Sequence, residues 1–128
     1  RAPPPAPRID RIAFLVENDA ELRRAMTLLL EKWGLSVLEA EGGEEALALI
    51  EEIGILPDVF LVDQNLGEGM TGLAFLAAVA ARHGAVPACL VTGLRDAGLA
   101  GRAAEAGVTV LTKPVDPRDL GAFLARLE

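Results

Sequence analysis

Hydrophobic residues gather in five short apolar runs, each followed by a longer segment with helical spacing. The runs cover residues 12–16, 36–40, 58–63, 87–92 and 108–111. Short runs rich in Val, Leu and Ile are typical of strands that are buried on both faces of a parallel sheet. The central run, Asp58-Val59-Phe60-Leu61-Val62-Asp63, stops at a carboxylate. We therefore predict five strands, with Asp63 at the carboxyl end of the third.

The segments between these runs have the spacing of amphipathic helices. In the first of them, Leu22, Met26 and Leu29 fall on one face, Asp19 can cap the start and Gly34 can end the helix. The predicted helices cover residues 19–33, 43–53, 73–83, 95–106 and 116–127. Regular alternation of strands and helices predicts a parallel sheet with right-handed crossovers, which is a doubly wound α/β domain.

Polar residues follow the predicted strands where each strand ends. They are Glu17, Asn18 and Asp19 after the first, Asp63 at the third, Thr92 at the fourth and Lys113 after the fifth. In open α/β sheets, ligands bind outside the carboxyl ends of the strands. Clustered carboxylates repel one another unless a divalent cation such as Mg²⁺ neutralises them. With a lysine and a hydroxyl nearby, such a site suits attack by a carboxylate on a phosphoryl group.

Each of these residues also has a purely structural interpretation. Asp63 is equally explained as the cap of a turn. Thr92 is explained as part of a strand end, and Lys113 as a surface lysine. Because the set occurs in order on alternating strands and helices, we favour the chemical interpretation.

From about Arg11 to its end, the chain resembles a receiver domain of bacterial two-component signalling. The resemblance implies a flavodoxin-like sheet with strand order 2-1-3-4-5 and Asp63 as the phosphoacceptor. It places Glu17 and Asn18 at the acidic pair that binds Mg²⁺, together with Asp63 and the backbone carbonyl of Asn65. It also implies that Thr92 and Lys113 bind phosphoryl oxygens, and that the bond before Pro114 is cis.

Three positions depart from the family pattern. Asn18 stands where the family normally has a metal-binding acid, Gly67 replaces a usual proline, and Val110 takes the place of a switching Tyr or Phe. Asn18 favours an alternative, a pseudo-receiver that is never phosphorylated and acts as a protein-interaction module. Because valine has no ring to relocate, we expect phosphorylation to shift the backbone of residues 93–98 instead.

Composition limits the remaining classes. The chain has 128 residues, about one domain, and a net charge of −7, which argues against direct contact with nucleic acid or anionic membranes. A single cysteine, Cys89, fits inert packing in a buried strand, and a reducing, cytoplasmic location. Glu17-Asn18-Asp19 would repel a phosphate at the loop where a flavodoxin-like cofactor binder needs one. No P-loop motif is present.

The first residues differ from the rest of the chain. Prolines at positions 3, 4, 5 and 7 indicate an extended linker over residues 1–9, with the receiver domain over residues 10–128. A linker on this side predicts a receiver at the C-terminus of a larger protein, and the resemblance points to a hybrid sensor histidine kinase. The partner we expect is a histidine kinase or a histidine phosphotransfer protein, and a homodimer is left open.

Overall fold

The computed structural model describes residues 11–93 and 97–127. Five strands within these residues form one parallel sheet. The strands are β1 (Ile12–Val16), β2 (Ser36–Ala40), β3 (Val59–Asp63), β4 (Ala88–Thr92) and β5 (Thr109–Thr112). Their order is β2-β1-β3-β4-β5, and every neighbouring pair is parallel. The predicted doubly wound, flavodoxin-like order is therefore confirmed. The predicted linker over residues 1–9 lies outside the described residues.

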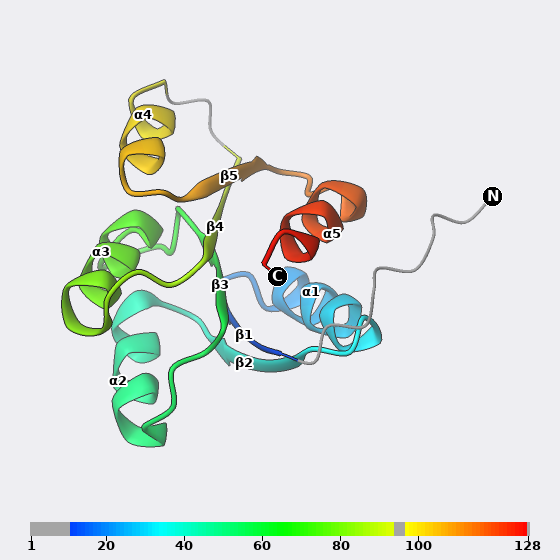
Figure 1. Ribbon diagram of the computed structural model, residues 1–128, viewed down its shortest axis with the longest axis horizontal. Helices are drawn as coiled ribbons and strands as arrows, with labels where there is room; N and C mark the ends of the chain where they lie inside the picture. The colour runs from blue at the N-terminus through cyan, green and yellow to red at the C-terminus, as the bar shows by residue number, and fades with distance from the viewer. Residues whose placement is uncertain (1–10, 94–96, 128) are drawn as a thin grey trace.

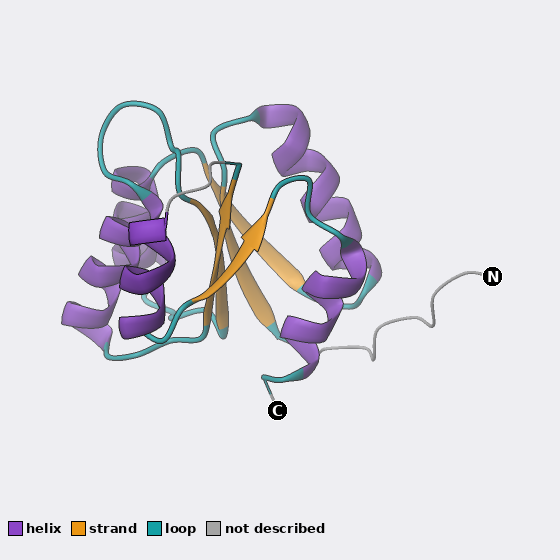
Figure 2. Cartoon of the chain, turned by 90° about the horizontal axis from the view of Figure 1, so that it is seen from above, coloured by secondary structure: helices purple, strands orange, loops and turns teal. Residues whose placement is uncertain are grey.

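Helices cover both faces of the sheet. They are α1 (Ala20–Lys32), α2 (Gly43–Ile53), α3 (Gly72–His83), α4 (Ala97–Glu105) and α5 (Pro117–Ala125). Figures 1 and 2 show α1 and α5 on one face and α2, α3 and α4 on the other. Within the described ranges, no helix is both long and apolar enough to cross a bilayer.

The last third of the chain differs from the predicted boundaries. Val108 is predicted to begin the fifth strand, but it lies between α4 and β5, and its N–H donates to the Ala103 carbonyl of α4 at 2.8 Å. The strand instead extends to Thr112, which pairs with Thr92 on β4. Strand β4 begins at 88 and α5 ends at 125, rather than at the predicted 87 and 127. Residues 94–96, where we placed the start of the fourth helix, lie outside the described residues.

Alternating side chains on the strands form two cores. One lies under α2, α3 and α4 and includes Phe14, Phe60 and Phe75. The Phe60 ring stacks on Phe14 with ring centroids 5.9 Å apart, and meets Phe75 edge-on at 5.4 Å. The other core lies under α1 and α5 and includes Leu61 and Cys89. The thiol of Cys89 is fully buried, which confirms that it packs inside a buried strand, and burial raises its pKa to about 12.

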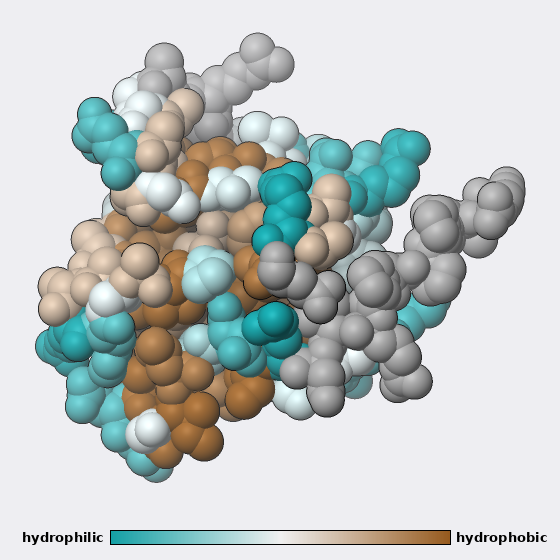
Figure 3. All heavy atoms as spheres, in the orientation of Figure 1, coloured by the Kyte–Doolittle hydropathy of each residue, from teal (hydrophilic) through white to brown (hydrophobic). Residues whose placement is uncertain are grey.

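A few large apolar side chains remain outside both cores. Ile53, Ile55 and Leu56 are exposed at the end of α2 and in the connection to β3. Figure 3 shows hydrophobic surface over this end of α2. This surface lies where β3 begins, whereas Asp63 is the last residue of that strand. The two features are therefore separated by the length of β3.

Gly72, the first residue of α3, touches the end of β3. A Cβ atom added at this position would overlap the carbonyl group of Asp63 and lie 2.9 Å from Leu90 Cδ1. The Gly72 N–H also donates to the Gln64 carbonyl at 3.1 Å. Only glycine therefore lets α3 begin this close to the strand, and this contact fixes where the loop after Asp63 ends.

We predict that Gly72→Ala destabilises the protein by about 2–3 kcal/mol, because overpacking against a main-chain carbonyl forces the backbone to move. The measurement is the free energy of unfolding in urea. Gly101→Ala is the matched control, because Gly101 lies inside α4 with nothing within 4 Å of the added atom. That variant should be neutral or up to about 1 kcal/mol more stable. Equal effects of the two substitutions would contradict the steric argument.

Candidate functional site

Four strands bring polar side chains together at the carboxyl edge of the sheet. Glu17 follows β1, Asp63 ends β3, Thr92 ends β4 and Lys113 follows β5. Glu17 and Asp63 are each 4% exposed and Thr92 is 5% exposed, and these are the buried polar or charged residues of the described part of the chain. The parallel sheet therefore brings together residues that are far apart in sequence, as their positions at the strand ends predict.

Lys113 joins the two buried carboxylates. Its Nζ atom lies 2.7 Å from Asp63 Oδ2 and 3.3 Å from Glu17 Oε1. Its backbone N–H donates to the Thr92 carbonyl at 2.8 Å, and the Lys113–Pro114 peptide bond is cis, as the resemblance implied. Burial lowers the pKa of Lys113, but the hydrogen bond to Asp63 and the charges of Asp63 and Glu17 outweigh it and raise the pKa overall. The interpretation of Lys113 as a plain surface lysine is wrong.

The surroundings of Glu17 disfavour its ionised form. Burial raises its pKa, and the neighbouring Asp63 carboxylate raises it further, while the Asp19 N–H, 3.1 Å from Oε2, and the charge of Lys113 lower it. The net direction is upward. Two carboxylates share one ammonium group, so the site holds an excess of negative charge that is only partly solvated.

The other two polar residues after β1 do not contact Lys113. Asp19 caps α1, with its Oδ1 accepting from the N–H groups of Glu21 at 3.0 Å and Leu22 at 3.2 Å. Asn18 is exposed. A Cβ atom added at Gly67 would lie 3.5 Å from Asn18 Nδ2, so the Asn18 amide sits beside the loop after β3. Only Glu17, of the three, contacts the ammonium group that pairs with Asp63.

The loop after Asp63 turns back on itself. The Asn65 N–H donates to Asp63 Oδ1 at 3.1 Å, and Asn65 Oδ1 accepts from the Gly67 N–H at 3.2 Å. Gly67 has φ +77°, a conformation that is closed to proline, which has no N–H either. The glycine at this family-atypical position therefore has a physical role, because it permits a turn that the usual proline would prevent.

Sequence reasoning missed Gln64, the residue directly after the predicted phosphoacceptor. Its Oε1 accepts from the Leu73 N–H at 2.8 Å and its backbone carbonyl accepts from Gly72. These bonds satisfy two of the four N–H groups that the first turn of a helix leaves without a helical partner. Gln64 therefore ties the start of α3 to the end of β3. A lone glutamine has no spacing signal that would have revealed this role.

The structure describes only part of the region that is predicted to respond to phosphorylation. Val110 is half-buried on β5 and packs against the core under α2, α3 and α4. Residues 94–96 of the segment that we expect to respond to phosphorylation lie outside the described residues. Its response therefore stays a prediction.

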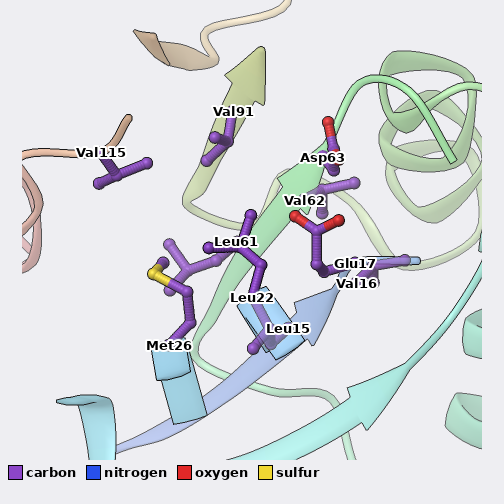
Figure 4. Close-up of a pocket in the computed structure, with 10 residues that line it drawn as sticks. All are labelled: Leu15, Val16, Glu17, Leu22, Met26, Leu61, Val62, Asp63, Val91 and Val115. Atoms are coloured by element: carbon purple, nitrogen blue, oxygen red, sulfur yellow. The ribbon is translucent and has the colours of Figure 1, made fainter. Parts of the chain in front are cut away.

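The chemistry of the donors fits Mg²⁺. In the described ranges, no group of three or more His, Cys, Asp or Glu side chains is arranged to hold a metal ion. Mg²⁺ keeps several waters, however, and is commonly held through one or two carboxylates. The buried pair Glu17 and Asp63 provides those carboxylates. Figure 4 shows them at the ends of neighbouring strands, beside a crevice lined by apolar side chains that include Leu22, Met26 and Val115.

Comparison with known proteins identifies the family. Residues 13–125 match the model of the response regulator receiver domain, and this chain belongs to that family. The fold and the family together support a phosphoacceptor role in two-component signal transduction.

Curated relatives are about one-third identical to this chain over the segments that align with it. A cyclic di-GMP phosphodiesterase from Thermotoga maritima is 35% identical over 104 residues, which is 80% of this chain and 27% of that protein. The DNA-binding transcriptional regulator NtrC of Klebsiella pneumoniae is 34% identical over 117 residues, which is 90% of this chain and 24% of that protein. The chain thus spans about a quarter of the length of these relatives.

Solved receiver structures superimpose closely. The chemotaxis protein CheY4 of Vibrio cholerae has a TM-score of 0.82 at 26% identity, with 94% of this chain and 100% of that chain covered. A CheY-like receiver domain protein from Methanospirillum hungatei has a TM-score of 0.80 at 25% identity, with 91% and 95% covered. The agreement extends over nearly the whole length of both proteins.

The raised pKa of Glu17 leads to a prediction about stability and pH in metal-free protein. Ionised Glu17 is less favourable in the folded than in the unfolded chain, so its penalty is absent below the ordinary pKa of 4.5 and grows as pH rises through the folded value. We expect Glu17→Gln, which cannot ionise, to raise the melting temperature in EDTA at about pH 8 by roughly 2–5 °C. The gain should fade as the pH approaches 4.5.

The control for this prediction is Glu52→Gln, which neutralises an exposed carboxylate on α2. It should change the melting temperature little at any pH in this range, because exposed charges contribute little. A loss of stability in Glu17→Gln at neutral pH, or a gain that does not depend on pH, would show that the buried acid is not strained.

Proposed function

We propose that this receiver accepts a phosphoryl group from a phosphohistidine onto the carboxylate of Asp63, with Mg²⁺ bound at the same site. The observation that carries the proposal is the Asp63 carboxylate itself. It lies at the carboxyl end of the central strand, 2.7 Å from Lys113 Nζ and beside Glu17. The donor would be a histidine kinase or a histidine phosphotransfer protein.

The transfer makes one bond and breaks one. An oxygen of Asp63 attacks phosphorus, while the phosphorus–nitrogen bond of the phosphohistidine breaks and the imidazole leaves with the electron pair and takes up a proton. Lys113 then moves from the carboxylates to a phosphoryl oxygen, to which its point charge is suited. The Thr92 hydroxyl binds a second oxygen. Phosphoryl transfer depends mainly on such positioning and charge stabilisation.

Mg²⁺ would be held by Glu17, Asp63, the backbone carbonyl of Asn65 and the amide oxygen of Asn18. When bound, it supplies positive charge that neutralises the carboxylates and the incoming phosphoryl oxygens. Asn18 offers a neutral oxygen where a carboxylate would offer a full charge. The proposed site therefore binds its cation more weakly than one with a complete acidic pair.

A second candidate function is supported by Asn18. A pseudo-receiver would keep the fold and act as a protein-interaction module without being phosphorylated. In that case Lys113 would serve only to neutralise Asp63 and Glu17. Phosphoryl uptake by Asp63 decides between the two candidates.

The setting of the domain is also part of the proposal. Residues 1–9 would be a linker, and the parent protein a hybrid sensor histidine kinase with a cytoplasmic receiver. Relatives include a DNA-binding regulator, but the net charge of −7 supports a domain that does not itself bind nucleic acid. A homodimer is compatible with this proposal.

The first experiment tests the acceptor. Incubation with acetyl phosphate and Mg²⁺ should add one phosphoryl group to the wild-type protein and none to Asp63→Asn, because the amide is not a nucleophile. Intact mass measures the uptake. Asp119→Asn, which changes an exposed acid on α5, is the control and should be phosphorylated normally. No uptake by the wild-type protein from acetyl phosphate or a phosphorylated histidine donor would favour the pseudo-receiver.

The second experiment tests Asn18. Asn18→Asp should tighten Mg²⁺ binding roughly tenfold, or about 1.4 kcal/mol, because it adds a full charge near the cation. Calorimetric titration of metal-free protein measures the affinity. Asp19→Asn should have a much smaller effect on Mg²⁺, because Asp19 is occupied as the cap of α1. Unchanged affinity in Asn18→Asp would mean that residue 18 lies outside the coordination sphere.

A further inference from the structure

Arg23 is a largely buried arginine beside the candidate site. It has no part in the proposed chemistry. Its side chain, on α1, is 16% exposed. Nη1 donates to the backbone carbonyl of Glu17 at 2.7 Å. Nε lies 3.3 Å from Glu39 Oε1, and Nη2 lies 3.7 Å from Glu41 Oε1. One guanidinium group therefore connects α1 with the carboxyl ends of β1 and β2.

Both the N–H and the carbonyl of the Glu17 main chain have hydrogen-bond partners. Its N–H donates to the Ala40 carbonyl of β2 at 3.0 Å, and its carbonyl accepts from Arg23. The carbonyl belongs to the peptide group that joins Glu17 to Asn18. Because the Glu17 side chain leaves the chain next to this peptide group, the orientation of the peptide group affects the direction of the Glu17 carboxylate. A charge-assisted bond of this length is among the stronger hydrogen bonds in proteins.

The charge of Arg23 is balanced away from the site. Glu39 and Glu41 lie at and after the end of β2, so they take up the positive charge on the side of the guanidinium group away from Glu17. The planar fork of arginine can bind a carbonyl and a carboxylate at the same time, which the single ammonium group of lysine does less well. The contacts thus favour an orienting role for Arg23 over a role as a counterion.

We propose that Arg23 is a positioning residue for the divalent cation. It holds the peptide group between Glu17 and Asn18 so that the Glu17 carboxylate faces Asp63 and Lys113. The inference rests on the proposed function, because it assumes that Glu17 helps to bind a cation. Residues that orient metal ligands commonly change metal affinity by about 10- to 100-fold when replaced.

The test is a titration of metal-free protein with Mn²⁺, in which electron paramagnetic resonance measures the free ion. Arg23→Met keeps an apolar stem but removes the fork and its charge. By charge alone, losing a cation would tighten Mn²⁺ binding. If Arg23 instead orients Glu17, its replacement should weaken Mn²⁺ binding roughly tenfold. Arg24→Met removes the same charge from an exposed neighbour on α1, and should leave Mn²⁺ binding unchanged or slightly tighter.

Two further variants separate orientation from general damage to the fold. Arg23→Lys keeps the charge and should weaken Mn²⁺ binding less than Arg23→Met, as a partial rescue; it also serves as the test if Arg23→Met does not fold. Glu17→Gln alone should weaken binding, and adding Arg23→Met to it should weaken binding little more, because Arg23 acts through Glu17. Additive losses would indicate a merely structural role and overturn the inference.

The failures of the two proposals can be told apart. Wild-type protein that binds Mn²⁺ while Arg23→Met and Arg23→Lys bind it equally well or more tightly would overturn the role of Arg23 and leave the cation site intact. Wild-type protein that binds no Mn²⁺ at millimolar concentration would overturn the cation site and the positioning role together.

Discussion

The ion pair between Lys113 and the two buried acids is the interaction on which this end of the molecule depends. Glu17 follows β1, Asp63 ends the neighbouring strand β3, and both are withdrawn from water. Buried acids of like charge are costly unless a cation is held among them. Lys113 supplies that cation from the far edge of the sheet, with Nζ 2.7 Å from Asp63 Oδ2. The ion pairs therefore stabilise the fold before any phosphoryl group is bound. They also keep the two acids close together at the place where a phosphoryl group would bind.

The path of the chain around Asp63 is fixed by contacts between the end of β3 and the start of α3. The loop after β3 has to leave the end of this strand and return to begin α3 against the same strand. Gln64 and Gly72 meet this requirement together, one by bonding the first turn of α3 and the other by having no side chain at the contact. On the opposite side, Arg23 and Ala40 hold the main chain of Glu17. The two acids are thus fixed through their backbones as well as through Lys113.

The strand ends were predictable from the sequence and the contacts between loops were not. Apolar runs that stop at Asp63 and Thr92 locate the carboxyl edge, and parallel topology then brings Glu17 and Lys113 to it. Gln64, Gly72 and Arg23 act through loop and helix geometry, which leaves no periodic signal. Asp19 is a further example of a contact that the sequence does not reveal. Its position close to Glu17 is evident from the sequence, whereas its hydrogen bonds to the first turn of α1 are not. The start of β5 was misplaced because Val108, apolar and adjacent to the strand, closes α4 instead.

Chemical modification of the buried Cys89 thiol can be used to follow opening of the sheet. The thiol lies on β4, fully enclosed between β3 and β5, and its high pKa keeps it protonated. A thiol reagent needs both contact and a thiolate, so modification has to wait until the centre of the sheet separates. The native sequence thus contains a single-site reporter of rare, large-scale opening events, in the way that slow amide exchange reports them. With no second cysteine, that signal would come from one position alone.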